Sequence, residues 1–143
     1  MMNNKNGNHF TLSLDSVPNK GHCVLVNKGK WLSVVFYEPA RKEILSWPIE
    51  IKKDLGSILT KLQKGELVGE PDTRPMRSVA SGCFEMRLKG ADGIYRVFYF
   101  LKTEVGILVF HSFKKKTQQT PIKEIDTGRS RLKAILKDLG NEE

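Results

Sequence analysis

The strongest constraint on the fold is a series of four strand-like runs between residues 76 and 113. The runs cover residues 76–81, 83–89, 94–102 and 106–113, with only Gly82, residues 90–93 and residues 102–106 between them. The last two runs are rich in β-branched and aromatic residues, which is typical of strands. Connections this short join antiparallel neighbours. This part of the chain therefore predicts an antiparallel sheet of about four strands.

The segments on either side of the predicted sheet carry strand and helix signals. Residues 31–37 are β-branched and aromatic and predict one more strand. Residues 39–46 could form a short helix, and Pro48 suits the first turn of a longer one over residues 49–64. Residues 121–139 also have helical spacing, although Gly128 weakens this helix by about 1 kcal/mol relative to alanine. The order strand, helical hairpin, antiparallel sheet, C-terminal helix predicts an α+β domain.

The first 30 residues do not share this pattern. Residues 1–10 are polar and rich in asparagine, and prolines and glycines interrupt the short apolar runs that follow. We interpret residues 1–30 as a partly disordered N-terminal extension and residues 31–143 as one folded domain. The sequence has no secretory signal and no apolar run long enough to span a membrane. We therefore expect a cytoplasmic protein without membrane partners.

Positive charge is concentrated on the predicted sheet. The chain has 24 Lys and Arg residues against 16 Asp and Glu residues, a formal net charge of +8. Residues 74–116 contain nine cations and three anions, whereas residues 117–143 contain five of each. Clustered positive charge attracts a polyanion, and phosphates are the usual anionic groups. Solubility alone would also explain a positive net charge, but the clustering favours a polyanion partner.

Two of the predicted strands carry charged side chains in positions that suggest a binding face. Along residues 83–89, Glu85, Arg87 and Lys89 alternate with apolar residues and therefore share one face. Arg96 lies within an aromatic run, where a guanidinium needs an anion or open water. It could pair with Glu85, clamp a phosphate, or do both, because a carboxylate can aim an arginine at a ligand. The alternative is an ordinary solvated sheet face.

One histidine and three lysines follow at the end of the last predicted strand, between His111 and Lys116. His111 continues the period of two set by Ile107 and Val109, so it could be a satisfied core histidine. The neighbouring cations would lower its pKa and favour a neutral imidazole, which suits a general base. The lysines could form a solvated charge run, but above a basic sheet at least one of them is expected to reach phosphate.

Histidine, arginine and lysine are sufficient to cleave RNA without a metal ion. The 2′-hydroxyl attacks the adjacent phosphorus, a base takes its proton, an acid serves the leaving 5′-oxygen, and cations stabilise the pentacoordinate phosphorane. The sequence contains no carboxylate cluster arranged for magnesium, no Gly-rich phosphate loop and no nucleophile motif. We therefore expect neither a metal ion nor a cofactor.

Three strings in this region are fairly specific in combination and weak apart. They read FEMR at residues 84–87, GIYRVFY at residues 93–99 and HSFKKKTQQTP at residues 111–121, and Glu124, Ile125 and Arg131 follow them. Together they resemble the RelE/ParE toxin superfamily, and most closely its phage-related HigB-like branch. The likeness covers residues 31–136, including the order of the elements, and implies a RelE-like fold.

This resemblance implies the toxin of a type II toxin–antitoxin pair. Ribonuclease members of the superfamily enter the ribosomal A site and cut mRNA there. The expected partners are therefore mRNA on the ribosome and a small helix-turn-helix antitoxin, with DNA contacted only through that antitoxin. RelE uses a tyrosine near its C-terminus, whereas this chain has Thr120 and Pro121 there. This difference places more weight on His111, since HigB-like members use histidine and acidic residues.

The resemblance also implies which residues form the site. The cationic sheet positions of the family fall on Arg87 and Arg96, and its late-strand basic position falls on residues 114–116. Two other functions stay open, namely a ParE-like gyrase inhibitor without catalysis and a basic RNA- or DNA-binding module. The predicted catalytic residues are Arg87, Arg96, His111, Lys115 and Lys116, and the predicted RNA-binding residues are Arg77, Glu85, Lys89, Lys114 and Gln118.

Overall fold

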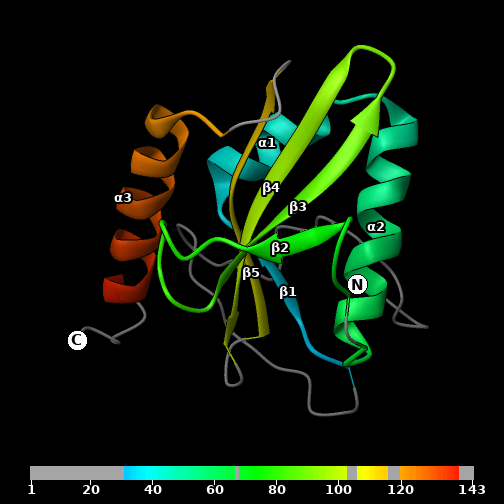
Figure 1. The fold of residues 1–143 in the computed structure, drawn as a ribbon. Helices are drawn as coiled ribbons and strands as arrows, with labels where there is room; N and C mark the ends of the chain where they lie inside the picture. The colour runs from blue at the N-terminus through cyan, green and yellow to red at the C-terminus, as the bar shows by residue number, and fades with distance from the viewer. Residues whose placement is uncertain (1–30, 67, 103–105, 116–119, 139–143) are drawn as a thin grey trace.

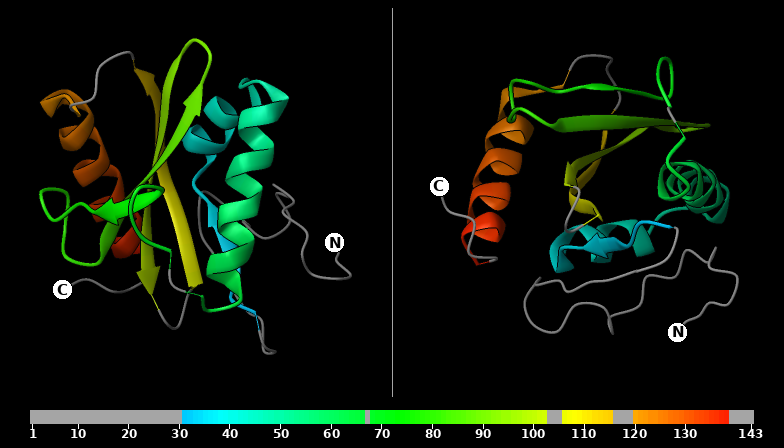
Figure 2. Two further views of the ribbon diagram at one scale, coloured as in Figure 1. Left: turned by 45° about the vertical axis from the view of Figure 1, so that its right-hand side comes forward. Right: turned by 90° about the horizontal axis from the view of Figure 1, so that it is seen from below.

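A computed structural model describes residues 31–66, 68–102, 106–115 and 120–138. A five-stranded sheet in the order β1-β5-β4-β3-β2 lies between α3 on one face and α1 and α2 on the other (Figures 1 and 2). No helix in these ranges combines the length and apolar character that crossing a membrane requires. The elements are β1 (Val34–Phe36), α1 (Glu38–Leu45), α2 (Ile49–Gln63), β2 (Thr73–Pro75), β3 (Cys83–Gly90), β4 (Gly93–Lys102), β5 (Gly106–Lys115) and α3 (Ile122–Asp138).

The predicted α+β class and the predicted helices are confirmed, and the architecture is compatible with a RelE-like fold. The sheet is mixed, however, because β1 pairs with β5 in parallel. The pairings of β3 with β4 and of β4 with β5 are antiparallel, as the short connections predict. The pairing of β2 with β3 is antiparallel as well. The predicted extension, residues 1–30, lies outside the described residues.

One predicted strand is wrong. Residues 76–81 form turns, in which the backbone N–H of Val79 donates to the carbonyl of Met76. The N–H of Met76 donates to the carbonyl of Cys83, which closes this segment into a loop. Met76 and Val79 are apolar because they are buried in the core on the α3 side, not because they pair in a sheet. The strand that pairs with β3 is instead β2, just before this loop.

The sheet has an apolar core on each face. Met86 and Val97 pack with α1 and α2, whereas Phe98 packs with Leu132 and Ile135 of α3. The predicted alternation along β3 is therefore confirmed, since its apolar residues face α1 and α2. Its charged residues face α3, in register with the α3-facing residues of β4.

Gly128 lies where α3 approaches the sheet most closely. A Cβ atom at this position would lie 2.8 Å from Cδ2 of Phe98 and 3.5 Å from Cε2 of Phe110. Gly128 lowers the intrinsic helix propensity of α3, but it permits close packing of α3 on β4 and β5. This packing holds the first turns of α3 above the end of β5.

A bulge in β5 decides which way His111 points. Tyr99 pairs with Val109 and Phe98 pairs with His111, so Phe110 is the extra residue in β5. A bulge of this kind re-aims the side chains that follow it. The expectation that His111 shares a face with Val109 is therefore wrong. Val109 packs towards α1 and α2, and His111 contacts Phe98 on the α3 side, with ring centroids 5.5 Å apart.

Candidate nucleic-acid site beneath the last helix

The strand register brings four predicted site residues together near the β3–β4 turn. Arg87 lies opposite Arg96, and Ile94 lies between Lys89 on one side and Lys115 on the other. All four side chains point to the α3 side of the sheet. They lie close together because neighbouring strands are about 4.8 Å apart. We call Arg87, Lys89, Arg96 and Lys115 the cationic face. Lys89 is exposed and Arg87 half-buried, whereas Arg96 and Lys115 are buried.

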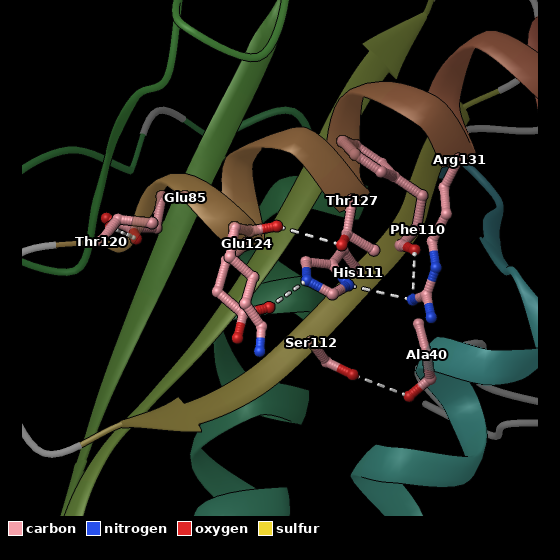
Figure 3. A network of polar contacts seen from close by, with 10 residues as sticks. Ala40, Glu85, Phe110, His111, Ser112, Thr120, Glu124, Thr127 and Arg131 are labelled. Atoms are coloured by element: carbon pink, nitrogen blue, oxygen red, sulfur yellow. Dashed lines mark hydrogen bonds and ion pairs between the residues drawn. The ribbon is translucent and has the colours of Figure 1, made fainter.

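Arg96 is fixed by a buried ion pair with Glu85. Both side chains are fully buried, and Nη1 of Arg96 lies 2.9 Å from Oε2 of Glu85. Glu85 also accepts a hydrogen bond from Nε of Arg74 at 3.0 Å. It accepts another from Oγ1 of Thr120 at 2.8 Å (Figure 3). The pairing that the sequence allowed is therefore present. In this arrangement Glu85 has no exposed surface for RNA and can act only by holding the cations around it.

Lys115 carries a buried ammonium whose hydrogen bonds are not satisfied by the part of the chain that the structure describes. Its exposed fraction is 9%, and among the described residues its Nζ atom has no hydrogen-bond partner. Burial lowers its pKa, and the charge of Arg96 lowers it further, while Glu85 and Glu124 act in the opposite direction. Burying an unpaired ammonium is costly. Side chains with perturbed pKa values cluster at functional sites, which makes Lys115 a candidate site residue.

The other members of the lysine run are not equivalent to Lys115. Lys114 is exposed and turns to the opposite face, where its Nζ atom lies 2.9 Å from Oδ2 of Asp92 and 5.5 Å from the ring centroid of Tyr95. The hydrogen bond to Asp92 is the main cause that raises the pKa of Lys114. Lys116 and Gln118 lie outside the described residues.

His111 joins β5 to α3 through both ring nitrogens. Nη1 of Arg131 donates to Nδ1 of His111 at 2.9 Å, and Nε2 donates to Oε1 of Glu124 at 2.7 Å (Figure 3). An arginine can only donate, so Nδ1 must be the acceptor and Nε2 must carry the proton of a neutral ring. The predicted neutral imidazole therefore fits, but the cations of the lysine run are not its main cause. Burial is the largest cause of the lowered pKa, and Arg131 adds to it.

Because the fold holds His111 neutral, we expect acidification to destabilise the protein through this residue. Burial keeps the pKa of folded His111 below 6.5, although the bond to Glu124 opposes this shift. The unfolded chain therefore binds the proton more tightly, and stability is lost as the pH falls below about 6.5. Between about pH 7.5 and about pH 5.5, the Tm of the wild type should fall more than that of His111→Gln. Equal pH slopes in circular dichroism melts would contradict this reading.

The remaining predicted residues lie at the margins of this site. The side chain of Arg87 is 24% exposed and reaches within 4.0 Å of Oε1 of Glu70. Arg87 and Lys89 also border a pocket of about 450 Å³ on the α2 side of β3, so these two residues contribute to the surface on both sides of the sheet. Arg77 is exposed in the loop after β2, and it is not part of the cationic face.

Three side chains that the sequence analysis left without a role belong to this site. Arg74 pairs with Glu85, and Glu124 and Arg131 bind the two nitrogens of His111. Glu124, Gly128 and Arg131 are spaced by four and three residues, which places them on one face of a helix. That spacing could have shown that Glu124 and Arg131 face the sheet with Gly128.

A known protein family matches the part of the chain that contains most of this site. The family described as Phage derived protein Gp49-like (DUF891) matches residues 42–133. The chain belongs to this Gp49-like family. The Gp49-like family is part of the RelE/HigB-type toxin superfamily and is a toxin-like family associated with toxin–antitoxin systems. The match includes the cationic face, Glu124 and Arg131. Searches of curated proteins and of solved structures find no match.

Proposed function

We propose that this Gp49-like protein is the toxin of a type II toxin–antitoxin system and cuts mRNA in the ribosomal A site. Membership of a toxin-like family supports the biological role. The observation that carries the chemistry is Lys115, a buried ammonium that has no hydrogen-bond partner within the described residues and lies on the cationic face. Such a group is prepared for a phosphate, because no hydrogen-bond partner among the described residues occupies its Nζ atom.

The cationic face suits the charge that develops when RNA cleaves itself through its 2′-hydroxyl. Attack on the adjacent phosphorus gives a phosphorane with added negative charge, which fixed cations stabilise most strongly in a water-poor site. Lys115 would contact the reacting phosphate, while Arg87 and Lys89, which are more exposed, would bind phosphates further along the strand. Arg96 is fully buried, so it would not touch the RNA. It would act through the electrostatic field of its guanidinium and through its ion pair with Glu85.

The partners follow from the same proposal. The substrate is mRNA held on the ribosome, and a cognate helix-turn-helix antitoxin neutralises the toxin. DNA would be contacted only through that antitoxin. The protein would work in the cytoplasm, where translating ribosomes are found.

Induction of the full chain in bacterial cells tests this function. We expect growth arrest within one or two generations, and primer extension should show new mRNA 5′ ends within reading frames but not in untranslated RNA. Arrest with an SOS response and intact mRNA would instead support a ParE-like gyrase inhibitor. RNA binding with a steep salt dependence and no growth arrest would support a binding module without catalysis. Either of these two results would contradict the proposed cleavage.

A further inference from the structure

We infer that Glu124 is the general base of this site, with His111 and Arg131 as the residues that position it. This inference rests on the proposed RNA cleavage and assigns its proton acceptor. Glu124 was not among the residues predicted to form the site. It lies in the first turn of α3, on the side of the helix that faces the sheet.

The three side chains form a chain of hydrogen bonds with one fixed direction. Arg131 donates to the carbonyl of Phe110 at 3.3 Å and to Nδ1 of His111 at 2.9 Å, which anchors the guanidinium on β5. His111 then donates from Nε2 to Oε1 of Glu124 at 2.7 Å. Both ring nitrogens are occupied, so His111 itself has no lone pair with which to take a proton from a substrate. The group at the end of the chain is the carboxylate.

The side chain of Glu124 is more accessible to a substrate than those of His111 and Glu85. The side chain of Glu124 is 22% exposed, compared with 6% for His111 and 0% for Glu85. The hydrogen bond from His111 uses only Oε1, and a carboxylate has lone pairs on two oxygens. A substrate hydroxyl can therefore approach Glu124 while its orientation is kept by β5. General bases are commonly held in place by a second residue in this way.

Glu124 and Lys115 lie on the same side of the sheet, so the two proton transfers of RNA cleavage can be divided between them. Both Lys115 and His111 lie on the α3 side of β5, and the charge of Glu124 acts on Lys115. In the proposed step the bond from the 2′-oxygen to phosphorus forms while the bond from phosphorus to the 5′-oxygen breaks. Glu124 accepts the proton of the 2′-hydroxyl, and the ammonium of Lys115 donates a proton to the leaving 5′-oxygen. The products are a 2′,3′-cyclic phosphate and a 5′-hydroxyl, and water restores both groups.

Glu124→Gln is the decisive variant, because its amide oxygen can still accept the hydrogen bond from His111 but cannot take a proton. We expect cleavage of mRNA on programmed ribosomes to slow by about 100-fold or more. Binding of an mRNA with a 2′-deoxy nucleotide at the cleavage site should not change. Asp126→Asn is the matched control, since Asp126 is an exposed carboxylate of the same helix that pairs with Arg129 at 3.1 Å. This control should cleave at the wild-type rate.

The pH dependence separates a base from a structural carboxylate. If Glu124 takes a proton in the reaction, the dependence of the cleavage rate on pH should differ between the wild type and Glu124→Gln. If Glu124→Gln cleaves at the wild-type rate with the same pH profile, the inference is overturned and the proposed function still stands. Loss of binding together with cleavage, or a lowered Tm, would assign Glu124 a structural role and also overturn it. A wild type that does not cleave mRNA would remove the proposed function itself.

Discussion

Replacement of Arg96 with alanine is expected to lower the free energy of unfolding by about 3–5 kcal/mol, because the partner carboxylate stays buried. Arg96 and Glu85 are both fully buried, with 2.9 Å between Nη1 and Oε2. Arg74 and Thr120 also bind Glu85, but they would leave the carboxylate with one cation fewer in a fully buried site. Urea denaturation followed by circular dichroism measures the loss. A change below about 1 kcal/mol, the range of exposed pairs, would contradict the buried ion pair.

The double variant Glu85→Met/Arg96→Met is the control for this prediction. Two apolar side chains of similar volume remove both charges together, and such replacements of buried pairs are often neutral or stabilising. The double variant should therefore be more stable than Arg96→Ala. If it is less stable, the loss comes from packing rather than from the stranded charge. Loss of toxicity in Arg96→Ala alone would also reflect the weakened fold, so this variant is a poor test of catalysis.

Lys115→Met is expected to slow mRNA cleavage by about 100- to 1,000-fold, the usual effect of removing one group that stabilises transition-state charge. Stability should be unchanged or higher. Burial and Arg96 lower the pKa of Lys115, so the fold disfavours the charged ammonium relative to the unfolded chain. Below the unfolded pKa this residue therefore costs stability, and an apolar side chain of similar length removes that cost. Single-turnover cleavage on programmed ribosomes and thermal unfolding measure the two effects.

Lys114→Met is the matched control for Lys115→Met. It removes the same charge one residue earlier, from an exposed side chain that faces away from α3 and pairs with Asp92 at 2.9 Å. Exposed pairs contribute little, so its cleavage rate should stay within about threefold of the wild type. Equal losses in the two variants would mean that only the net charge matters. A fully active Lys115→Met would exclude Lys115 from the reaction.

Local patterns in the sequence were enough to predict most elements of this fold. The helical spacing of residues 49–64 is a local pattern, and so is the alternation around Glu85 and Arg87. Each can be recognised within a single helix or strand. The strands that hold Arg87 and Arg96 were predicted as neighbours because only residues 90–93 separate them. Their register, which aligns these two arginines, is seen only in the structure, where the tight turn between the strands sets it.

The parts that were missed depend on contacts between distant segments. The parallel pairing of β1 with β5 joins residues about 70 positions apart, and no local pattern specifies it. The extra residue Phe110 in β5 moved His111 to the other face, since a single inserted residue reverses the alternation that follows. The bonds of His111 to Glu124 and Arg131 depend on that reversal and on the close packing of Gly128.

The most direct test of the proposed function is to incubate the purified full chain with ribosomes that carry a defined mRNA in the A site and to analyse the ends of the products. We expect cleavage at one position in the A-site codon, with a 2′,3′-cyclic phosphate on the upstream fragment and a 5′-hydroxyl on the downstream fragment. The same mRNA without ribosomes should be cut far more slowly. Intact mRNA on the ribosome, or products with a 3′-hydroxyl and a 5′-phosphate, would contradict 2′-hydroxyl attack at the cationic face.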